Sequence, residues 1–115
     1  MKKIALLLII VTNLLSNSIA QVSTQDSLAL VDLYNATNGG SWNNNNNWLS
    51  NNKIGNWHGV SVANNRVTQV VLYNNNLTGV LPNSIGNLSS ITRFVVSYNN
   101  LSGNLPVSMS NWNSI

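Results

Sequence analysis

The chain has 115 residues, a net charge of +3 and no cysteine. Only 6% of its residues are charged, whereas asparagine alone makes up about one residue in five. This length predicts a single domain, and the lack of cysteine excludes a disulfide scaffold. The sparse charge also excludes the basic stripe that is typical of nucleic-acid-binding proteins, so we expect no nucleic-acid partner.

The first 20 residues have the pattern of a signal peptide. Lys2 and Lys3 precede an aliphatic run at residues 4–11, and small residues lie at the cleavage position near Ala20. A retained membrane anchor is the alternative, but a spanning helix needs about 20 apolar residues and polar residues interrupt this run from Thr12 onward. We therefore expect a secreted or cell-surface protein without a transmembrane segment, whose net charge falls to about +1 once both lysines are removed.

Residues 21–66 predict an N-terminal cap that begins with a helix. Ser23 and Asp26 have capping-box spacing, and the acidic side chain lies near the positive end of the helix. Leu30, Leu33 and Tyr34 share one helical face. The helix is expected to stop at residues 38–40, which are Asn-Gly-Gly.

Three tryptophans follow the helix, at Trp42, Trp48 and Trp57. Their large rings predict a packed core for the cap, with a sugar-stacking platform as the less favoured alternative. Val60, Val62 and Val67 predict short strands on either side of a turn at residues 64–65.

Residues 67–90 and 91–114 form two copies of one 24-residue pattern, and Ile115 begins a third. Seven apolar positions coincide, which the high asparagine content does not explain. They are Val67, Val70, Leu72, Leu77, Leu81, Ile85 and Leu88 in the first copy, and Ile91, Phe94, Val96, Leu101, Leu105, Met109 and Trp112 in the second. Side chains that alternate between inward and outward predict short strands at residues 69–73 and 93–97. We expect these strands to be parallel, because each coil buries its inward face only by stacking on the next coil.

Three polar or special residues recur at equivalent positions of both copies. An asparagine after each strand is expected to bond to the backbone of adjacent coils, a glycine allows unusual backbone angles, and a proline fixes the extended segment on the convex side. Short helical or 3₁₀ turns should follow the prolines. The pairs are Asn75 and Asn99, Gly79 and Gly103, and Pro82 and Pro106.

This pattern resembles the leucine-rich repeat, and the run at residues 80–88, VLPNSIGNL, resembles its plant-type subclass. The Trp57 to Val60 motif is similar to the end of that family's N-terminal cap. The resemblance implies an α/β solenoid with a helical, tryptophan-rich cap, about two repeats, convex 3₁₀ turns and an open C-terminal end. Plant members usually clamp the cap with paired cysteines, so this chain is more similar to the cysteine-free bacterial and protist surface proteins.

The sequence does not predict an enzyme, a metal site or a cofactor. Residues that could supply acid–base chemistry are few after the signal peptide: Asp26 and Asp32 lie on different helix faces, and His58 is the one histidine. No carboxylate or thiol lies at ligand spacing from His58.

We expect ligand binding, to a protein or a carbohydrate, on the outward side of the repeat strands. The alternative is a structural role, as the N-terminal piece of a longer surface protein that continues or self-associates through an open last coil. Four N-glycosylation sequons, at Asn35, Asn76, Asn87 and Asn100, matter only in a host that modifies them. The expected contact residues are Gln69, Val71, Tyr73, Asn74, Arg93, Val95, Ser97 and Tyr98.

Overall fold

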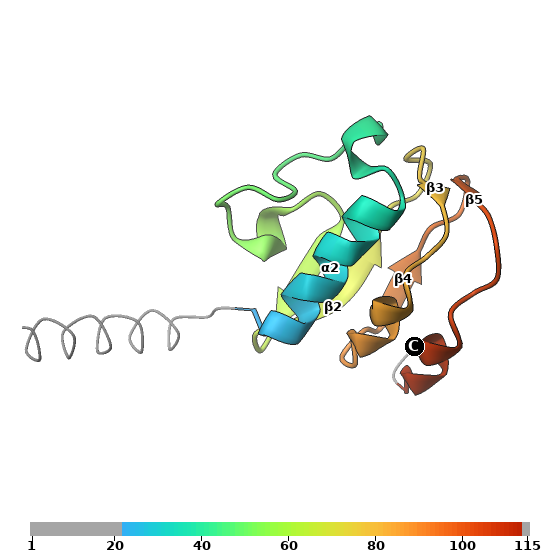
Figure 1. Cartoon of the computed structure of the whole chain (residues 1–115). Helices are drawn as coiled ribbons and strands as arrows, with labels where there is room; N and C mark the ends of the chain where they lie inside the picture. Colours follow the sequence, from blue (N-terminus) through green and yellow to red (C-terminus); the bar gives the residue numbers. More distant parts are fainter. Residues whose placement is uncertain (1–21, 114–115) are drawn as a thin grey trace, which may run out of the picture.

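The computed structural model describes residues 22–113, so the predicted signal peptide and the predicted third repeat at Ile115 lie outside the described residues. One helix packs against two small sheets whose strands come from successive turns of the chain (Figure 1). The elements are α2 (Thr24–Ala36), β1 (Val60–Ala63), β2 (Arg66–Val71), β3 (Thr78–Gly79), β4 (Arg93–Val95) and β5 (Asn100–Leu101), with 3₁₀ turns η1 (Gly39–Ser41), η2 (Ile54–Asn56), η3 (Asn83–Asn87) and η4 (Val107–Asn111).

Helix α2 begins and ends where the local sequence predicts. The Ser23 hydroxyl accepts a hydrogen bond from the backbone N–H of Asp26 at 3.2 Å, which satisfies one of the unpaired donors at the helix start. At the other end the Thr37 hydroxyl donates to the Leu33 carbonyl at 2.6 Å, and Asn38 turns the chain with a positive φ of 57°. Leu30 and Leu33 are fully buried, so this face of α2 faces the core.

The main sheet has the order β1, β2, β4. β1 pairs antiparallel with β2, and β2 pairs parallel with β4, with Gln69 opposite Arg93 and Val71 opposite Val95. A second parallel pair joins β3 to β5 with Thr78 opposite Asn100. The two copies of the sequence pattern therefore stack in parallel: β2 and β4 pair at an offset of 24 residues, the separation of Asn75 and Asn99, whereas β3 and β5 pair at an offset of 22.

The strands differ from the ranges predicted from the sequence. The first predicted strand, 69–73, is β2 at residues 66–71, and the second, 93–97, is β4 at residues 93–95. The first strand starts earlier because its N-terminal half pairs with β1, across a bulge that leaves Thr68 without a register partner. Both strands end earlier because the residues that follow adopt left-handed backbone angles at Asn74 and Tyr98.

The turns that close the two repeats are 3₁₀ helices that begin after Pro82 and Pro106. Ile85 of η3 is fully buried against the core, and α2 packs on the same turn. Gly79 has a φ of +86°, and a Cβ atom there would lie 2.5 Å from the Ala36 carbonyl oxygen. Glycine is thus required at this position both by its backbone angle and by the close approach of the end of α2.

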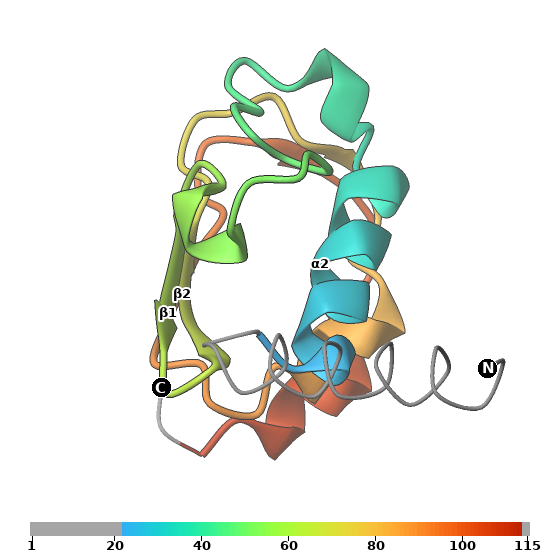
Figure 2. The same cartoon turned by 90° about the vertical axis from the view of Figure 1, so that its left-hand side faces the viewer.

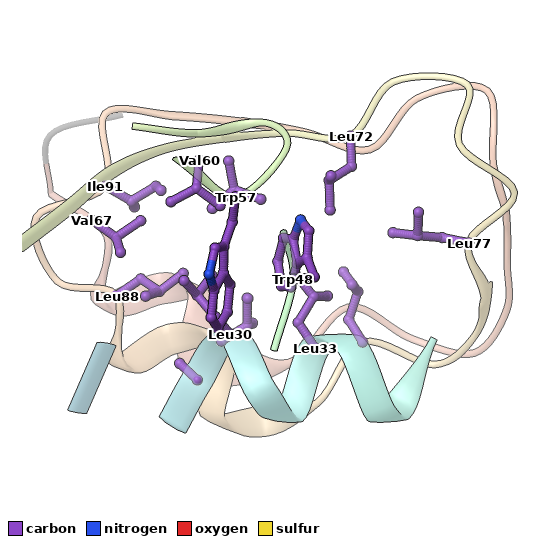
Figure 3. Close-up of a cluster of buried hydrophobic side chains, with 14 of the residues drawn as sticks. Leu30, Leu33, Trp48, Trp57, Val60, Val67, Leu72, Leu77, Leu88 and Ile91 are labelled. Carbon is purple, nitrogen blue, oxygen red and sulfur yellow. The ribbon is translucent and has the colours of Figure 1, made fainter. Parts of the chain in front are cut away.

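Aromatic side chains fill much of the space between α2 and the sheet. Trp48 and Trp57 lie between the leucines of α2 and the strand side, with ring centroids 5.1 Å apart (Figure 3). Figure 2 shows α2 on one side of the molecule and the β1–β2 pair on the other, and the core lies between them. Each such ring removes roughly 150–250 Å² of surface from water, which stabilises a segment that has no disulfide.

The two repeats are not equally buried. Leu81 of the first repeat is 6% exposed, whereas its equivalent Leu105 is 70% exposed. Equivalent apolar positions of the two copies therefore differ in burial. The physical reason is that the second repeat covers the first, while no described residue covers the second; Val107 is exposed for the same reason.

Asp26 connects α2 to the first repeat. Its carboxylate is fully buried and accepts two hydrogen bonds from the Arg66 guanidinium, at 2.9 and 3.0 Å, and one from the Val67 backbone N–H at 2.8 Å. The side-chain hydrogen bond from Arg66 to Asp26 raises the pKa of Arg66 above its ordinary value, against the opposing effect of burial. The pair therefore fixes the start of the helix against the start of β2.

We expect Asp26→Asn to lower the free energy of unfolding by about 2 to 3 kcal/mol, because the variant leaves the partly buried Arg66 without its carboxylate. Asp32→Asn is the matched control, since Asp32 is exposed and accepts one hydrogen bond from Ser84; its effect should stay within about 0.5 kcal/mol. Urea titration of both variants measures the difference. Equal effects would show that the buried pair does not anchor the helix.

Candidate ligand-binding face

Asn75 and Asn99 connect successive turns of the chain through their side-chain amides. Asn99 Oδ1 accepts hydrogen bonds from the backbone N–H groups of Asn75, at 3.0 Å, and Leu77, at 2.8 Å, and Asn99 Nδ2 donates to the Leu72 carbonyl at 2.8 Å. Asn75 repeats this one turn earlier, where its amide accepts from the backbone N–H of Asn44 and donates to the carbonyl of the same residue. Backbone groups that the turns leave unpaired are satisfied in this way.

The parallel register aligns side chains in pairs on the outward side of the sheet. Gln69 lies beside Arg93, and Val71 beside Val95. Arg93 is exposed and the other three are half-buried. Ser61 of β1 lies next to Gln69 and widens this face, which the sequence did not predict because residue 61 was placed in the cap.

Tyr73 and Tyr98 form an exposed aromatic pair at the end of the strands. Their ring centroids are 5.1 Å apart and the rings meet edge to face at 65°. The sequence predicted Tyr73, Asn74, Ser97 and Tyr98 as outward residues of the strands. That placement is wrong, because all four lie beyond the ends of β2 and β4. Asn74 and Tyr98 adopt left-handed backbone angles there, and the Asn74 N–H donates to the Ser97 carbonyl at 3.0 Å.

A shallow hollow of about 430 Å³ lies beside this aromatic pair. Five of its six lining residues are asparagines and none carries a charge. Its lining residues are Asn43, Asn74, Asn76, Tyr98, Asn99 and Asn100. The sequence predicted Asn74 and Tyr98 as contact residues and Asn99 as a structural residue. The 24-residue offset could have paired Asn76 with Asn100, whereas Asn43 comes from a segment without a repeat.

The other residues that the sequence singled out lie in the core or in turns. Trp42 Nε1 donates to the Thr37 carbonyl at 3.0 Å and Trp48 Nε1 to the His58 carbonyl at 2.9 Å, so both rings are held in the core. The indole N–H groups of Trp57 and Trp112 are buried without a hydrogen-bond partner among the described residues. Gly103 adopts a φ of +73°, like its equivalent in the first repeat.

The described residues offer little acid–base or metal chemistry. Residues 22–113 contain no group of three or more histidine, cysteine, aspartate or glutamate side chains that could hold a metal ion. Asp26 is committed to Arg66, and Asp32 accepts a hydrogen bond from the Ser84 hydroxyl on the surface. Within the same range, no helix is long and apolar enough to cross a membrane.

Comparison with solved structures shows a leucine-rich-repeat-like fold. A leucine-rich repeat protein from Bacteroides eggerthii is 32% identical over 64% of this chain, with a TM-score of 0.56. A plant ice-binding protein is 23% identical over 79% of the chain with a TM-score of 0.67, and the BIR2 ectodomain from Arabidopsis thaliana is 20% identical over 79% with a TM-score of 0.56. The two more distant proteins bear on the fold alone.

This chain is short beside these structures, since it spans 13%, 30% and 62% of their respective lengths. No protein-family model matches the sequence, and no curated protein matches it either.

We expect Asn99→Ala to lower the free energy of unfolding by about 2 kcal/mol or more, because two backbone N–H groups, those of Asn75 and Leu77, lose their acceptor. Asn104→Ala is the control, since Asn104 is exposed and its side chain makes no hydrogen bond within residues 22–113. Thermal and urea unfolding of both variants measure the effect. A loss no larger than in the control would rule out a structural role for this amide.

Proposed function

We propose that this chain is a secreted or cell-surface, non-catalytic recognition module: a leucine-rich-repeat solenoid of the plant-type subclass, with its N-terminal segment as a cap. The observation that carries the proposal is the parallel pairing of β2 with β4 at an offset of 24 residues. This pairing displays side chains from two repeats on one face, which is the usual contact surface of solenoid proteins. The ligand is a protein or a carbohydrate.

The composition of the face supports recognition by hydrogen bonds and aromatic contacts. Arg93 is its one charged residue within the described part of the chain, and Tyr73 is exposed just beyond the end of β2. Tyrosine and arginine are enriched at protein interfaces, and both combine a large contact area with hydrogen-bonding groups. A non-catalytic role agrees with the engagement of Asp26 in an ion pair.

A structural role as the start of a longer array is the alternative. It is favoured by the exposed apolar side chains of Leu105 and Val107 on the uncovered side of the second repeat. A further coil, or a second copy of the chain, could cover them and bury the half-exposed Phe94 and Leu101 beneath.

If this uncovered side mediates contact, the chain should associate as its concentration rises, and Leu105→Ser with Val107→Ser should return it to a monomer. The exchange removes two exposed apolar side chains, so it should barely change the free energy of unfolding. Sedimentation velocity over a hundredfold concentration range measures the association. A wild-type chain that stays monomeric throughout would count against self-association.

The recognition proposal is tested by placing a photo-cross-linking amino acid at position 93, on the outward side of β4. We expect discrete adducts with extracellular proteins from the source culture, and an excess of unlabelled chain should compete for them. A matched variant carries the cross-linker at position 83, an exposed residue of η3.

Adducts at position 93 but not at position 83 are the expected result, because only the former lies on the strand face. The same adducts from both positions, or none from position 93, would argue against a protein-binding face on the strands.

A further inference from the structure

We propose that the asparagine-lined hollow beside Tyr98 binds a neutral saccharide. The inference rests on the proposed recognition function and narrows it to one ligand class at one end of the face. Its residues are contributed by three successive turns of the chain: Asn43 from the N-terminal segment, Asn74 and Asn76 from the first repeat, and Tyr98, Asn99 and Asn100 from the second.

The aromatic side chain of the site, Tyr98, contacts Tyr73 edge to face. Tyr98 is 76% exposed, and the edge-to-face contact with Tyr73 leaves much of its ring surface open to solvent. A sugar ring has an apolar face of C–H groups, which can pack on an aromatic ring while its hydroxyls point sideways. The Tyr98 ring therefore offers a stacking surface at the edge of a polar hollow.

Two side-chain amides of the hollow, those of Asn43 and Asn76, use their NH₂ groups in hydrogen bonds to the backbone and leave their oxygen atoms free to accept. Asn76 Nδ2 donates to the Ser41 carbonyl at 3.0 Å, and Asn43 Nδ2 donates to the Asn74 carbonyl at 3.3 Å. Neither Oδ1 atom accepts a hydrogen bond within residues 22–113, so each presents an acceptor of set orientation. Such preorganisation lowers the entropy that binding costs.

Two further amides add both donors and acceptors. The side chains of Asn74 and Asn100 make no hydrogen bond among the described residues, and both are exposed at the hollow. Saccharide hydroxyls donate and accept in the same way, so uncharged amides match them. A charged ligand gains nothing here, because no charged side chain lines the hollow.

The backbone of Tyr98 gives independent support. Tyr98 has a φ of 57°, in the left-handed region that asparagine and glycine tolerate but that is unusual for a bulky side chain. The equivalent residue of the first repeat is Asn74, with a φ of 50°. Tyrosine here occupies a backbone position better suited to asparagine, and apart from its contact with Tyr73 most of its ring is exposed, which points to a use for the free part of the ring.

The test compares the wild-type chain with Tyr98→Asn and Tyr98→Phe. Titration calorimetry with soluble cello-, malto-, manno- and xylo-oligosaccharides measures binding, and an acidic oligogalacturonate serves as the charged comparison. The protein is produced in a host that leaves Asn76 and Asn100 unmodified, because both are in glycosylation sequons.

We expect the wild-type chain to bind at least one neutral oligosaccharide more tightly than the acidic one. Tyr98→Asn should weaken that binding at least about tenfold, because the stacking surface is lost, while its melting temperature stays equal or rises as the strain is relieved. Tyr98→Phe, which keeps the ring, should bind within about threefold of wild type. Together these results would assign the ring to the ligand rather than to the fold.

Three results would overturn the inference: binding of none of the neutral oligosaccharides, preference for the acidic one, or unchanged binding by Tyr98→Asn. The cross-linking test at position 93 separates this failure from that of the recognition proposal. Protein adducts at position 93 without saccharide binding would remove the saccharide site alone. Saccharide binding without protein adducts at position 93 would support the saccharide site in this hollow and argue against a protein-binding face.

Discussion

The structure depends on hydrogen bonds to the backbone N–H and C=O groups that lack a strand partner at the point where each turn leaves its strand. Asn75 and Asn99 supply the missing donors and acceptors, and each bonds to the turn that precedes it. An amide can do this because it donates and accepts at once, which neither a carboxylate nor an aliphatic side chain does. Since the two asparagines are 24 residues apart, their bonds impose the same offset on the strands.

This constraint also builds the candidate site. The bond between the Asn75 amide and the Asn44 backbone makes the N-terminal segment take the place of a preceding repeat. Asn43, next to it in the chain, is thereby brought against Asn74 and reaches the hollow. Asp26 and Arg66 hold the opposite end of the same segment. Fold and face are therefore consequences of the same contacts.

The sequence predicts the regular part of this arrangement well and the irregular part poorly. The boundaries of α2 follow from the capping residues at its ends. The buried face of Leu30 and Leu33 and the inward side chains of Val70 and Leu72 follow from periodicity. Periodicity assigns equivalent residues to equivalent places but carries no information about turn conformation. The left-handed angle at Tyr98, and with it the Tyr73 contact, therefore could not be predicted.

Other features were missed because they depend on segments without a repeat. The strand β1 was predicted from Val60 and Val62, but the bulge in its pairing with β2 was not. Asn43 belongs to a run of five asparagines whose members look alike in sequence. Leu81 and Leu105 hold equivalent positions of the sequence pattern but differ in burial, because burial depends on what lies on the other side of the coil. Local pattern thus determines which way a side chain points, whereas its exposure is decided by the neighbouring turn.

The most direct test of the central claim is a measurement of which strand residues face one another. Cross-strand nuclear Overhauser effects between β2 and β4 in isotope-labelled protein report this without reference to any ligand. Parallel contacts that join Gln69, Val70 and Val71 to Arg93, Phe94 and Val95 at a constant offset of 24 residues are predicted. Antiparallel contacts, or a parallel register with another offset, would contradict the stacking and the binding face built on it.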